Sequence, residues 1–137
     1  MNIGLGNRRW TILLIDADSH ARAALRLALE EAGFAVGEAA TDRDGERTVL
    51  RIKPDAILAE LMSDAADGGP SIAERLHATA STIPCYIVSN AGDALMGSIG
   101  LHEIGISGVF LKPVDAAIVI QTLKTRLGTG PRSAGNA

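Results

Sequence analysis

The stretch Pro54-Asp55-Ala56-Ile57-Leu58-Ala59-Glu60-Leu61-Met62 decides the expected fold. Its apolar centre, residues 56–59, is typical of a strand that is buried on both faces of a parallel sheet. Glu60 follows directly, so this strand delivers a carboxylate to its carboxyl end. Open α/β sheets bind their ligands along that edge. The segment therefore predicts a parallel sheet with an acidic residue at its ligand-binding edge.

Further apolar runs, rich in isoleucine, leucine and valine, predict the other strands of this sheet. The five expected strands are residues 11–15, 34–39, 55–59, 84–89 and 108–111. The stretches between them have helical spacing, most clearly the first, where Asp18 and Ser19 are candidate N-caps and Gly33 closes the helix. The other expected helices are residues 42–52, 69–79, 93–104 and 114–127. Strands that alternate with helices through right-handed crossovers predict a (βα)5 doubly wound fold with a five-stranded parallel sheet.

Length and composition indicate one globular domain. Of the 137 residues, we expect 11–127 to form the domain and 1–10 and 128–137 to be tails, because both ends are rich in small and polar residues. The net charge of −3 argues against a surface that follows nucleic-acid phosphates. No apolar run near the amino terminus is long enough to span a membrane, and Cys85 lies in an apolar run typical of a buried thiol. We therefore expect a cytoplasmic protein that binds neither nucleic acid nor membrane.

Polar residues follow the ends of four expected strands. They are Asp16, Glu60, Ser89 and Lys112. Because the carboxyl ends of parallel strands meet at one edge, these side chains should converge. A lysine, a hydroxyl and two carboxylates suit an anionic or phosphoryl ligand, with the carboxylates available to Mg²⁺. A structural ion pair between Glu60 and Lys112 is an equally good interpretation at this point.

In their order along the chain, these motifs resemble the receiver domain of two-component response regulators, over residues 11–127. The matching segments are Ile12-Leu13-Leu14-Ile15-Asp16-Ala17-Asp18, the stretch 54–62 followed by Asp67-Gly68, Ile87-Val88-Ser89-Asn90, and residues 105–113, which end in Lys-Pro. The resemblance implies a flavodoxin-like receiver fold.

The resemblance also implies roles for the edge residues. In that family an aspartate takes a phosphoryl group from a phosphohistidine of a partner kinase. An acidic pair and the acceptor hold Mg²⁺, and a hydroxyl and a lysine hold the transferred group. By matched position, Glu60 takes the acceptor place, Asp16 is the first acid, Ser89 supplies the hydroxyl and Lys112 the amine.

This chain departs from the family pattern at the acceptor and at the metal site. Glu60 stands in the aspartate's place and moves the carboxylate outward by roughly 1.5 Å, which disfavours in-line attack and lets Glu60 imitate the phosphorylated state. Ala17 replaces the second acid, so we expect a weak or absent Mg²⁺ site formed by Asp16 and Glu60, and no cofactor. Asp18 is the alternative ligand, although a residue just before a helix is more often its N-cap.

A third departure concerns the surface that changes on activation in the family. Its aromatic switch position is Val109 here, and Phe110 should point to the opposite face of the sheet. The candidate switch and interface residues are Asn90, Leu95, Met96, Ile99, Val109, Phe110, Pro113, Ile118 and Val119. Some of the five on the expected helices, which are Leu95, Met96, Ile99, Ile118 and Val119, must belong to the core, and the sequence does not distinguish them.

Together these features predict a pseudo-receiver: a phosphorylation-independent signalling module that is not an enzyme and acts by binding another protein. Because the sequence shows no effector domain, we expect output through a partner in trans, either a histidine kinase or a downstream effector, and homodimer formation stays open. One alternative is an active phosphoacceptor that uses Glu60 or a nearby acid such as Asp16. Another is a small α/β domain that binds a metabolite anion through Lys112 and Ser89.

Overall fold

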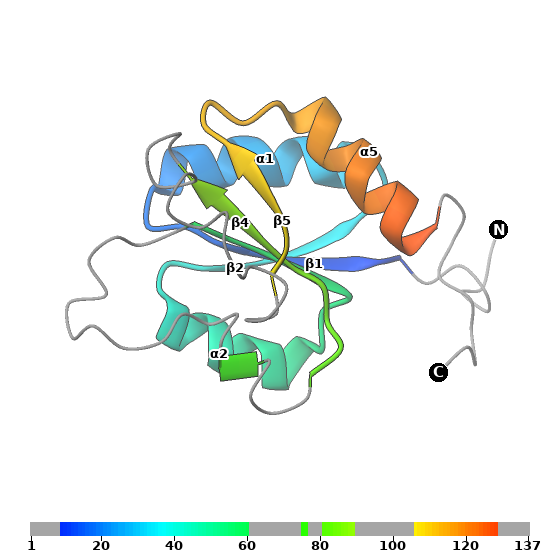
Figure 1. Ribbon diagram of the computed structural model, residues 1–137. Coiled ribbons are helices and arrows are strands. Elements are labelled where there is room, and N and C mark those ends of the chain that lie inside the picture. The colour runs from blue at the N-terminus through cyan, green and yellow to red at the C-terminus, as the bar shows by residue number, and fades with distance from the viewer. Residues whose placement is uncertain (1–8, 61–74, 77–80, 90–105, 129–137) are drawn as a thin grey trace, which may run out of the picture.

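The computed structural model describes residues 9–60, 75–76, 81–89 and 106–128 (Figure 1). Within them, five strands form one sheet in the order β2-β1-β3-β4-β5, and every pairing is parallel. The strands are β1 (Thr11–Ile15), β2 (Ala35–Ala39), β3 (Ala56–Glu60), β4 (Cys85–Ser89) and β5 (Ile106–Leu111). This order confirms the predicted doubly wound parallel sheet.

The described helices cover both faces of the sheet. They are α1 (Ser19–Glu31), α2 (Asp42–Ile52) and α5 (Ala116–Leu127). Figure 1 shows α1 and α5 on one face and α2 on the other. Of the two remaining predicted helices, 93–104 lies outside the described residues, and only Arg75 and Leu76 of 69–79 are described, both helical.

Each face of the sheet has its own apolar core, because successive strand residues point to opposite sides. Leu13 and Ile57 pack on the α2 side with Val49 of that helix. Ile12 and Leu58 pack on the α1 and α5 side, in a cluster that also contains Leu29, Val119 and Leu123. The central strands are thus buried on both faces, as their continuous apolar runs predict.

The packing of the core shows which way several of the candidate switch and interface residues point. Val109 packs on the α2 side and Phe110 on the α5 side, so the prediction of opposite faces is confirmed. Val119 is 0% exposed, so it is one of the candidate interface residues that belong to the core, whereas its neighbour Ile118 is 56% exposed. The helix turns Val119 toward the sheet and Ile118 away from it.

Local side-chain chemistry determines where the helices begin and end. Asp18 is the N-cap of α1, as predicted, since its carboxylate accepts hydrogen bonds from the backbone N–H of His20 (3.0 Å) and Ala21 (3.2 Å). The chain leaves α1 through Gly33, whose φ of 102° is a left-handed conformation that favours glycine. The α5 helix begins two residues later than predicted because Asp115 caps it through the N–H of Ala117 at 2.9 Å.

Several strand boundaries also differ from the prediction, and β2, β3 and β4 each begin one residue later than expected. The third strand runs one residue further, so Glu60 is its last residue rather than the first residue after it. The fifth strand begins at Ile106, two residues early, because the register shifts between Cys85 and Tyr86, where Ser107 is an extra residue. An extra residue of this kind is a β-bulge, which a pattern of apolar residues does not reveal.

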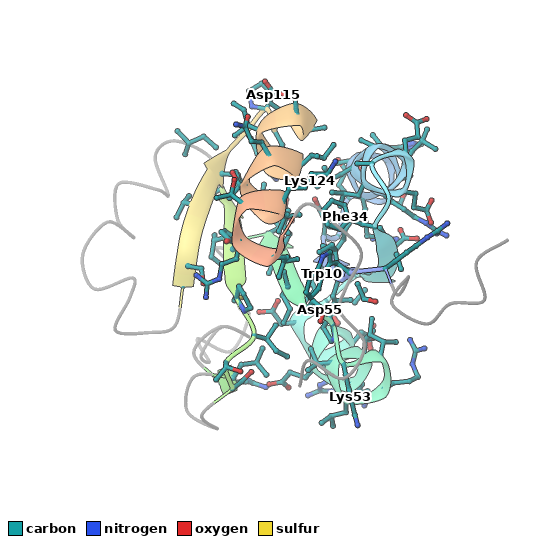
Figure 2. All side chains as sticks on the ribbon, turned by 90° about the vertical axis from the view of Figure 1, so that its right-hand side faces the viewer. Trp10, Phe34, Lys53, Asp55, Asp115 and Lys124 are labelled. Atoms are coloured by element: carbon teal, nitrogen blue, oxygen red, sulfur yellow. The ribbon has the colours of Figure 1, made fainter. Side chains whose placement is uncertain are left out.

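The first and last described segments meet at the edge of the sheet opposite Glu60. The carbonyl of Trp10 accepts a hydrogen bond from the N–H of Ala35 at 2.9 Å, and its ring packs on the core beneath α5. Gly128 ends α5 beside it, so that a Cβ built there would lie 4.0 Å from Cζ2 of Trp10. Figure 2 shows Trp10 and Phe34 on the α5 side of the sheet and Lys53 at the end of α2.

Candidate functional site

The carboxyl edge of the sheet carries the four predicted polar residues. Asp16 follows β1, Glu60 ends β3, Ser89 ends β4 and Lys112 follows β5. Ser89 is 2% exposed, and its carbonyl accepts a hydrogen bond from the N–H of Lys112 at 2.8 Å. The parallel sheet therefore brings the sequence-distant acids and the lysine to one edge, as expected.

Glu60 and Lys112 form an ion pair across this edge. The Nζ of Lys112 donates a hydrogen bond to Oε2 of Glu60, and the side chains are 32% and 16% exposed, respectively. This hydrogen bond is the main reason that the pKa of Lys112 is raised, while partial burial acts in the opposite direction. Both charges are thus partly withdrawn from water and balance each other.

Asp16 lies next to this pair with its carboxylate partly buried. Its Oδ1 accepts a hydrogen bond from the N–H of Asp18 at 2.8 Å. Burial raises the pKa of Asp16, and repulsion from Glu60 raises it further. The hydrogen bond from Asp18 and the positive charge of Lys112 lower the pKa but do not cancel the rise. The edge therefore holds more negative than positive charge around Asp16.

These carboxylates do not fit the Mg²⁺ site that the family resemblance implies. Asp18 is engaged as the cap of α1, where two backbone N–H groups lower its pKa. Glu60 is engaged by Lys112, and the position after Asp16 is Ala17. Within the described ranges, no three His, Cys, Asp or Glu side chains are grouped so as to hold a metal ion. Mg²⁺ requires several oxygen ligands in octahedral geometry, which Asp16 alone does not supply.

The sequence did not indicate that Arg22 binds both the backbone of Asp16 and the side chain of Glu38. Arg22 of α1 donates a hydrogen bond from Nη1 to the carbonyl of Asp16 and another from Nε to Oε1 of Glu38 at 2.8 Å. Arg26 donates to the second oxygen of Glu38, and the hydrogen bond to Arg22 is the main cause of the lowered pKa of Glu38. The only sequence signal is that Arg22 lies one turn into the helix that follows Asp16.

A cavity of about 360 Å³ lies beside the ion pair. Asp16, Asp18 and Lys112 line it together with apolar residues of α1 and of the segment that leads into α5, among them Leu25 and Val114. Its charged lining has two acids and one lysine that is already paired with Glu60. This charge balance does not favour a metabolite anion as its ligand.

The structure describes only some of the other residues that the sequence singled out. Asn90, Leu95, Met96 and Ile99 lie outside the described residues. Pro113 follows Lys112 through a cis peptide bond, and Phe110 packs against Tyr86 with ring centroids 5.5 Å apart. Cys85 is buried, as predicted, and burial raises the pKa of its thiol to about 12, which makes it unreactive.

Comparison with known proteins agrees with this geometry. The family model described as "Response regulator receiver domain" matches residues 12–124. The chain is 30% identical over 130 residues to the transcriptional regulatory protein CseB of Streptomyces coelicolor, covering 90% of this chain and 54% of that protein. It is 29% identical over 122 residues to the transcriptional regulatory protein AfsQ1 of the same organism, covering 89% and 53%, respectively. The chain thus spans about half the length of these relatives.

Solved structures show the same fold. A response regulator from Desulfuromonas acetoxidans matches with a TM-score of 0.74 and 24% identity over 86% of this chain and 96% of that one. A CheY-like response regulator receiver domain protein from Methanospirillum hungatei matches with a TM-score of 0.73 and 20% identity, covering 86% and 93%, respectively. The fold is therefore the flavodoxin-like receiver fold.

The chain belongs to the response regulator receiver domain family, whose members are modules of two-component signalling. Receiver domains of this family interact with kinases or effectors. None of the helices among the described residues is both long and apolar enough to cross a membrane.

Proposed function

We propose that this receiver domain works without phosphoryl transfer and signals by binding a protein partner, either a kinase or an effector. The observation that carries the proposal is the ion pair between Glu60 and Lys112. It places a carboxylate against the amine that, by family resemblance, holds the transferred phosphoryl group. Glu60 thereby imitates the phosphorylated state with a group that cannot be hydrolysed.

The reach of the glutamate side chain supports this proposal. Glu60 ends β3 and Lys112 directly follows β5, and these strands lie on either side of β4, so the two backbones are roughly two strand spacings, or about 9.6 Å, apart. Two long side chains are required to meet across that span. An aspartate would end about one carbon–carbon bond, ~1.5 Å, short of the position of the Glu60 carboxylate.

The poor fit to Mg²⁺ supports the proposal independently. Phosphoryl transfer relies on a cation to offset the charge that develops on the phosphoryl oxygens. Here Ala17 removes one carboxylate, and the remaining acids are engaged with backbone N–H groups or with Lys112. Transfer to Glu60 would also require this ion pair to open first.

Labelling with acetyl phosphate in the presence of Mg²⁺ tests the proposal. We expect no acid-stable, base-labile label on the wild type or on Glu60→Asp, because neither has the second acid. The double variant Ala17→Asp/Glu60→Asp restores both groups and should be labelled. Circular dichroism spectra should show that all variants are folded.

Glu60→Ala is the matched control for the acceptor. Label on the wild type that disappears in Glu60→Ala would overturn the proposal and show that Glu60 is a working phosphoacceptor. Label that persists in Glu60→Ala would overturn it as well and would point to another acid, with Asp16 as the first to test.

A further inference from the structure

The cavity beside the Glu60–Lys112 pair has an apolar lining that continues into the core. Its volume of about 360 Å³ lies within the range of small-molecule sites in proteins, about 300–1,000 Å³. Val88 of β4 is only 6% exposed, and Leu25 and Val114 pack on the same core cluster. All three line the cavity. A ligand there would therefore contact the aliphatic side chains of the core on the α5 side of the sheet.

Small side chains on two helices also line this cavity. Ala21 and Ala24 belong to α1, and Ala116 begins α5. Because their side chains reach the cavity, a leucine in place of one of them would extend into its volume. Ala23, by contrast, is exposed on the same helix and is not a lining residue. The pair Ala23 and Ala24 thus allows the same substitution to be made inside and outside the cavity.

The charges around the cavity are predominantly negative. Asp16 and Asp18 line it, and Glu60 lies next to Asp16. Lys112 is the only cation among the described lining residues, and it already donates a hydrogen bond to Glu60. Arg22 binds the backbone carbonyl of Asp16 and is itself paired with an acid of β2. Three carboxylates are therefore grouped around one amine, which favours a further cation here.

An organic cation fits this site better than a metal ion does. Mg²⁺ needs several oxygen ligands in octahedral geometry, and Ala17 removes one of them. An ammonium group needs only acceptors for its three N–H donors. Oδ1 of Asp16 accepts the N–H of Asp18, but an ionised carboxylate can accept about four hydrogen bonds, so Asp16 retains acceptor sites.

We propose that this cavity binds a free organic amine, with its ammonium group at Asp16 and a short aliphatic body against Leu25, Val88 and Val114. Seven of the ten lining residues are apolar. This lining favours a body without polar groups over a lysine side chain of a partner, whose far end carries backbone amides. The inference goes beyond the proposed function and does not depend on whether Glu60 accepts a phosphoryl group.

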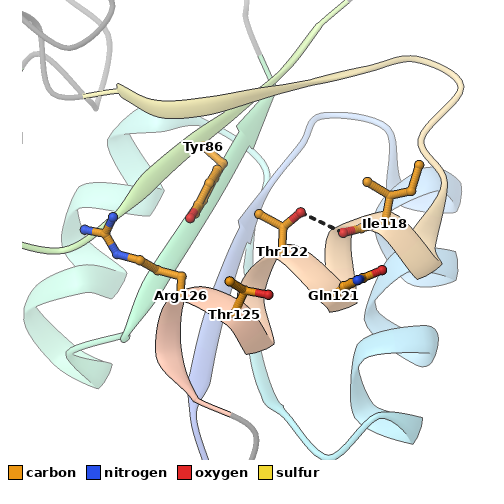
Figure 3. A pocket seen from close by; sticks show the side chains of 6 residues that line it. All are labelled: Tyr86, Ile118, Gln121, Thr122, Thr125 and Arg126. Carbon is orange, nitrogen blue, oxygen red and sulfur yellow. Dashed lines mark hydrogen bonds between the residues drawn. The ribbon is translucent and has the colours of Figure 1, made fainter.

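A second hollow in the protein provides an internal control. It lies between Tyr86 of β4 and α5 and has a volume of about 600 Å³. Figure 3 shows the six residues that line it, of which Arg126 alone is charged. A hollow with a positive charge does not favour an ammonium group. It should therefore not respond to the amine.

An NMR titration of ¹⁵N-labelled protein at pH 7 and fixed ionic strength tests the proposal. The probes n-hexylamine, 1-hexanol and hexanoate have similar aliphatic chains and differ in charge. We expect n-hexylamine to shift the backbone amides of Ala21, Leu25 and Val114 with a Kd on the order of 1 mM. The other two probes should bind at least about tenfold more weakly. The amides of Gln121 and Thr125, which line the second hollow, should not shift.

Three variants separate the charge from the shape of the cavity. Asp16→Asn keeps a hydrogen-bond acceptor but removes the charge, and it should weaken binding of n-hexylamine by about tenfold or more. Ala24→Leu should weaken binding to a similar extent because it fills part of the cavity. Ala23→Leu is the matched control and should bind as the wild type does.

Each of four results would overturn the proposal. Equal binding of n-hexylamine and 1-hexanol would show that charge does not matter. Equal affinity of the wild type and Asp16→Asn, or of the wild type and Ala24→Leu, would place the ligand elsewhere. Binding of Nα-acetyl-lysine N-methylamide as tightly as n-hexylamine would assign the cavity to a lysine side chain of a partner.

Failure of this proposal can be distinguished from failure of the proposed function. The amine can fail to bind while the wild type stays unlabelled by acetyl phosphate, which would overturn only the amine site. Label on the wild type while n-hexylamine still binds at Asp16 would overturn only the proposed function.

Discussion

Asp16 is the residue at the carboxyl edge whose charge is least well balanced. Burial raises its pKa in the folded protein above the ordinary value of 3.8, with repulsion from Glu60 as a further cause. The folded state therefore takes up a proton at a higher pH than the unfolded state does. It follows that ionised Asp16 lowers stability above its folded pKa, and that this penalty disappears as the pH falls through that value.

We predict that Asp16→Asn is more stable than the wild type at pH 7. Asparagine keeps the oxygen that accepts the N–H of Asp18 but removes the charge beside Glu60. Urea unfolding at a series of pH values measures the difference, which should shrink as the pH falls toward 4 because wild-type Asp16 then becomes neutral.

Asp16→Ala is the control for this prediction. It removes both the charge and the hydrogen-bond acceptor, so it should be less stable than Asp16→Asn across the whole pH series. A stability advantage of Asp16→Asn that is the same at pH 4 and pH 7 would contradict the assignment of the effect to the Asp16 charge.

Some residues of this site could be predicted from the sequence, and others could not. Asp16, Glu60, Ser89 and Lys112 could be predicted because each stands at or just after the end of a strand, and a parallel sheet gathers those ends. The contact of Arg22 with Glu38 could not. It depends on the register in which Leu14 of β1 pairs with Glu38 of β2, and apolar spacing does not specify such a register.

Among the elements, α1 has an end that depends on a single residue. Gly33 has a φ of 102°, and a Cβ built there would meet nothing within 4 Å. The only cost of a side chain at this position is therefore the left-handed backbone itself. We predict that Gly33→Ala lowers the free energy of unfolding by about 1 kcal/mol, measured by urea denaturation.

Gly33→Asn separates the backbone effect from general disturbance. Asparagine adopts left-handed conformations more readily than alanine does, so Gly33→Asn should lose less stability than Gly33→Ala. If the two variants were equally destabilised, the backbone explanation would be wrong.

The element boundaries show where tertiary structure overrides local patterns. The 42–52 helix could be predicted to the residue, because Thr41 caps it and Pro54 follows its end closely. The beginning of β5 could not, since the bulge opposite Cys85 and Tyr86 arises from pairing between strands rather than from the β5 sequence.

At the scale of the whole molecule, the two apolar cores share one sheet. Ile57 is 0% exposed on the α2 side, while Trp10 packs on the α5 side. We predict that Ile57→Ala lowers the free energy of unfolding by about 3 kcal/mol. The transition followed by Trp10 fluorescence should shift together with that followed by circular dichroism, because both cores unfold as one unit.

Leu50→Ala provides the comparison for this experiment. Leu50 is 80% exposed on α2, so its truncation should leave the unfolding transition nearly unchanged. A fluorescence transition that stays in place in Ile57→Ala while the circular dichroism transition moves would show instead that the two faces unfold separately.

The proximity of Trp10 and Gly128 has a consequence for engineering this domain. Because the chain enters β1 and leaves α5 at the same corner, a short linker could join these two points in a circularly permuted protein. New ends could then be opened elsewhere in the fold. A reporter protein attached at the original corner would stand at the edge of the sheet opposite the Glu60–Lys112 pair, and would leave that pair accessible to a partner.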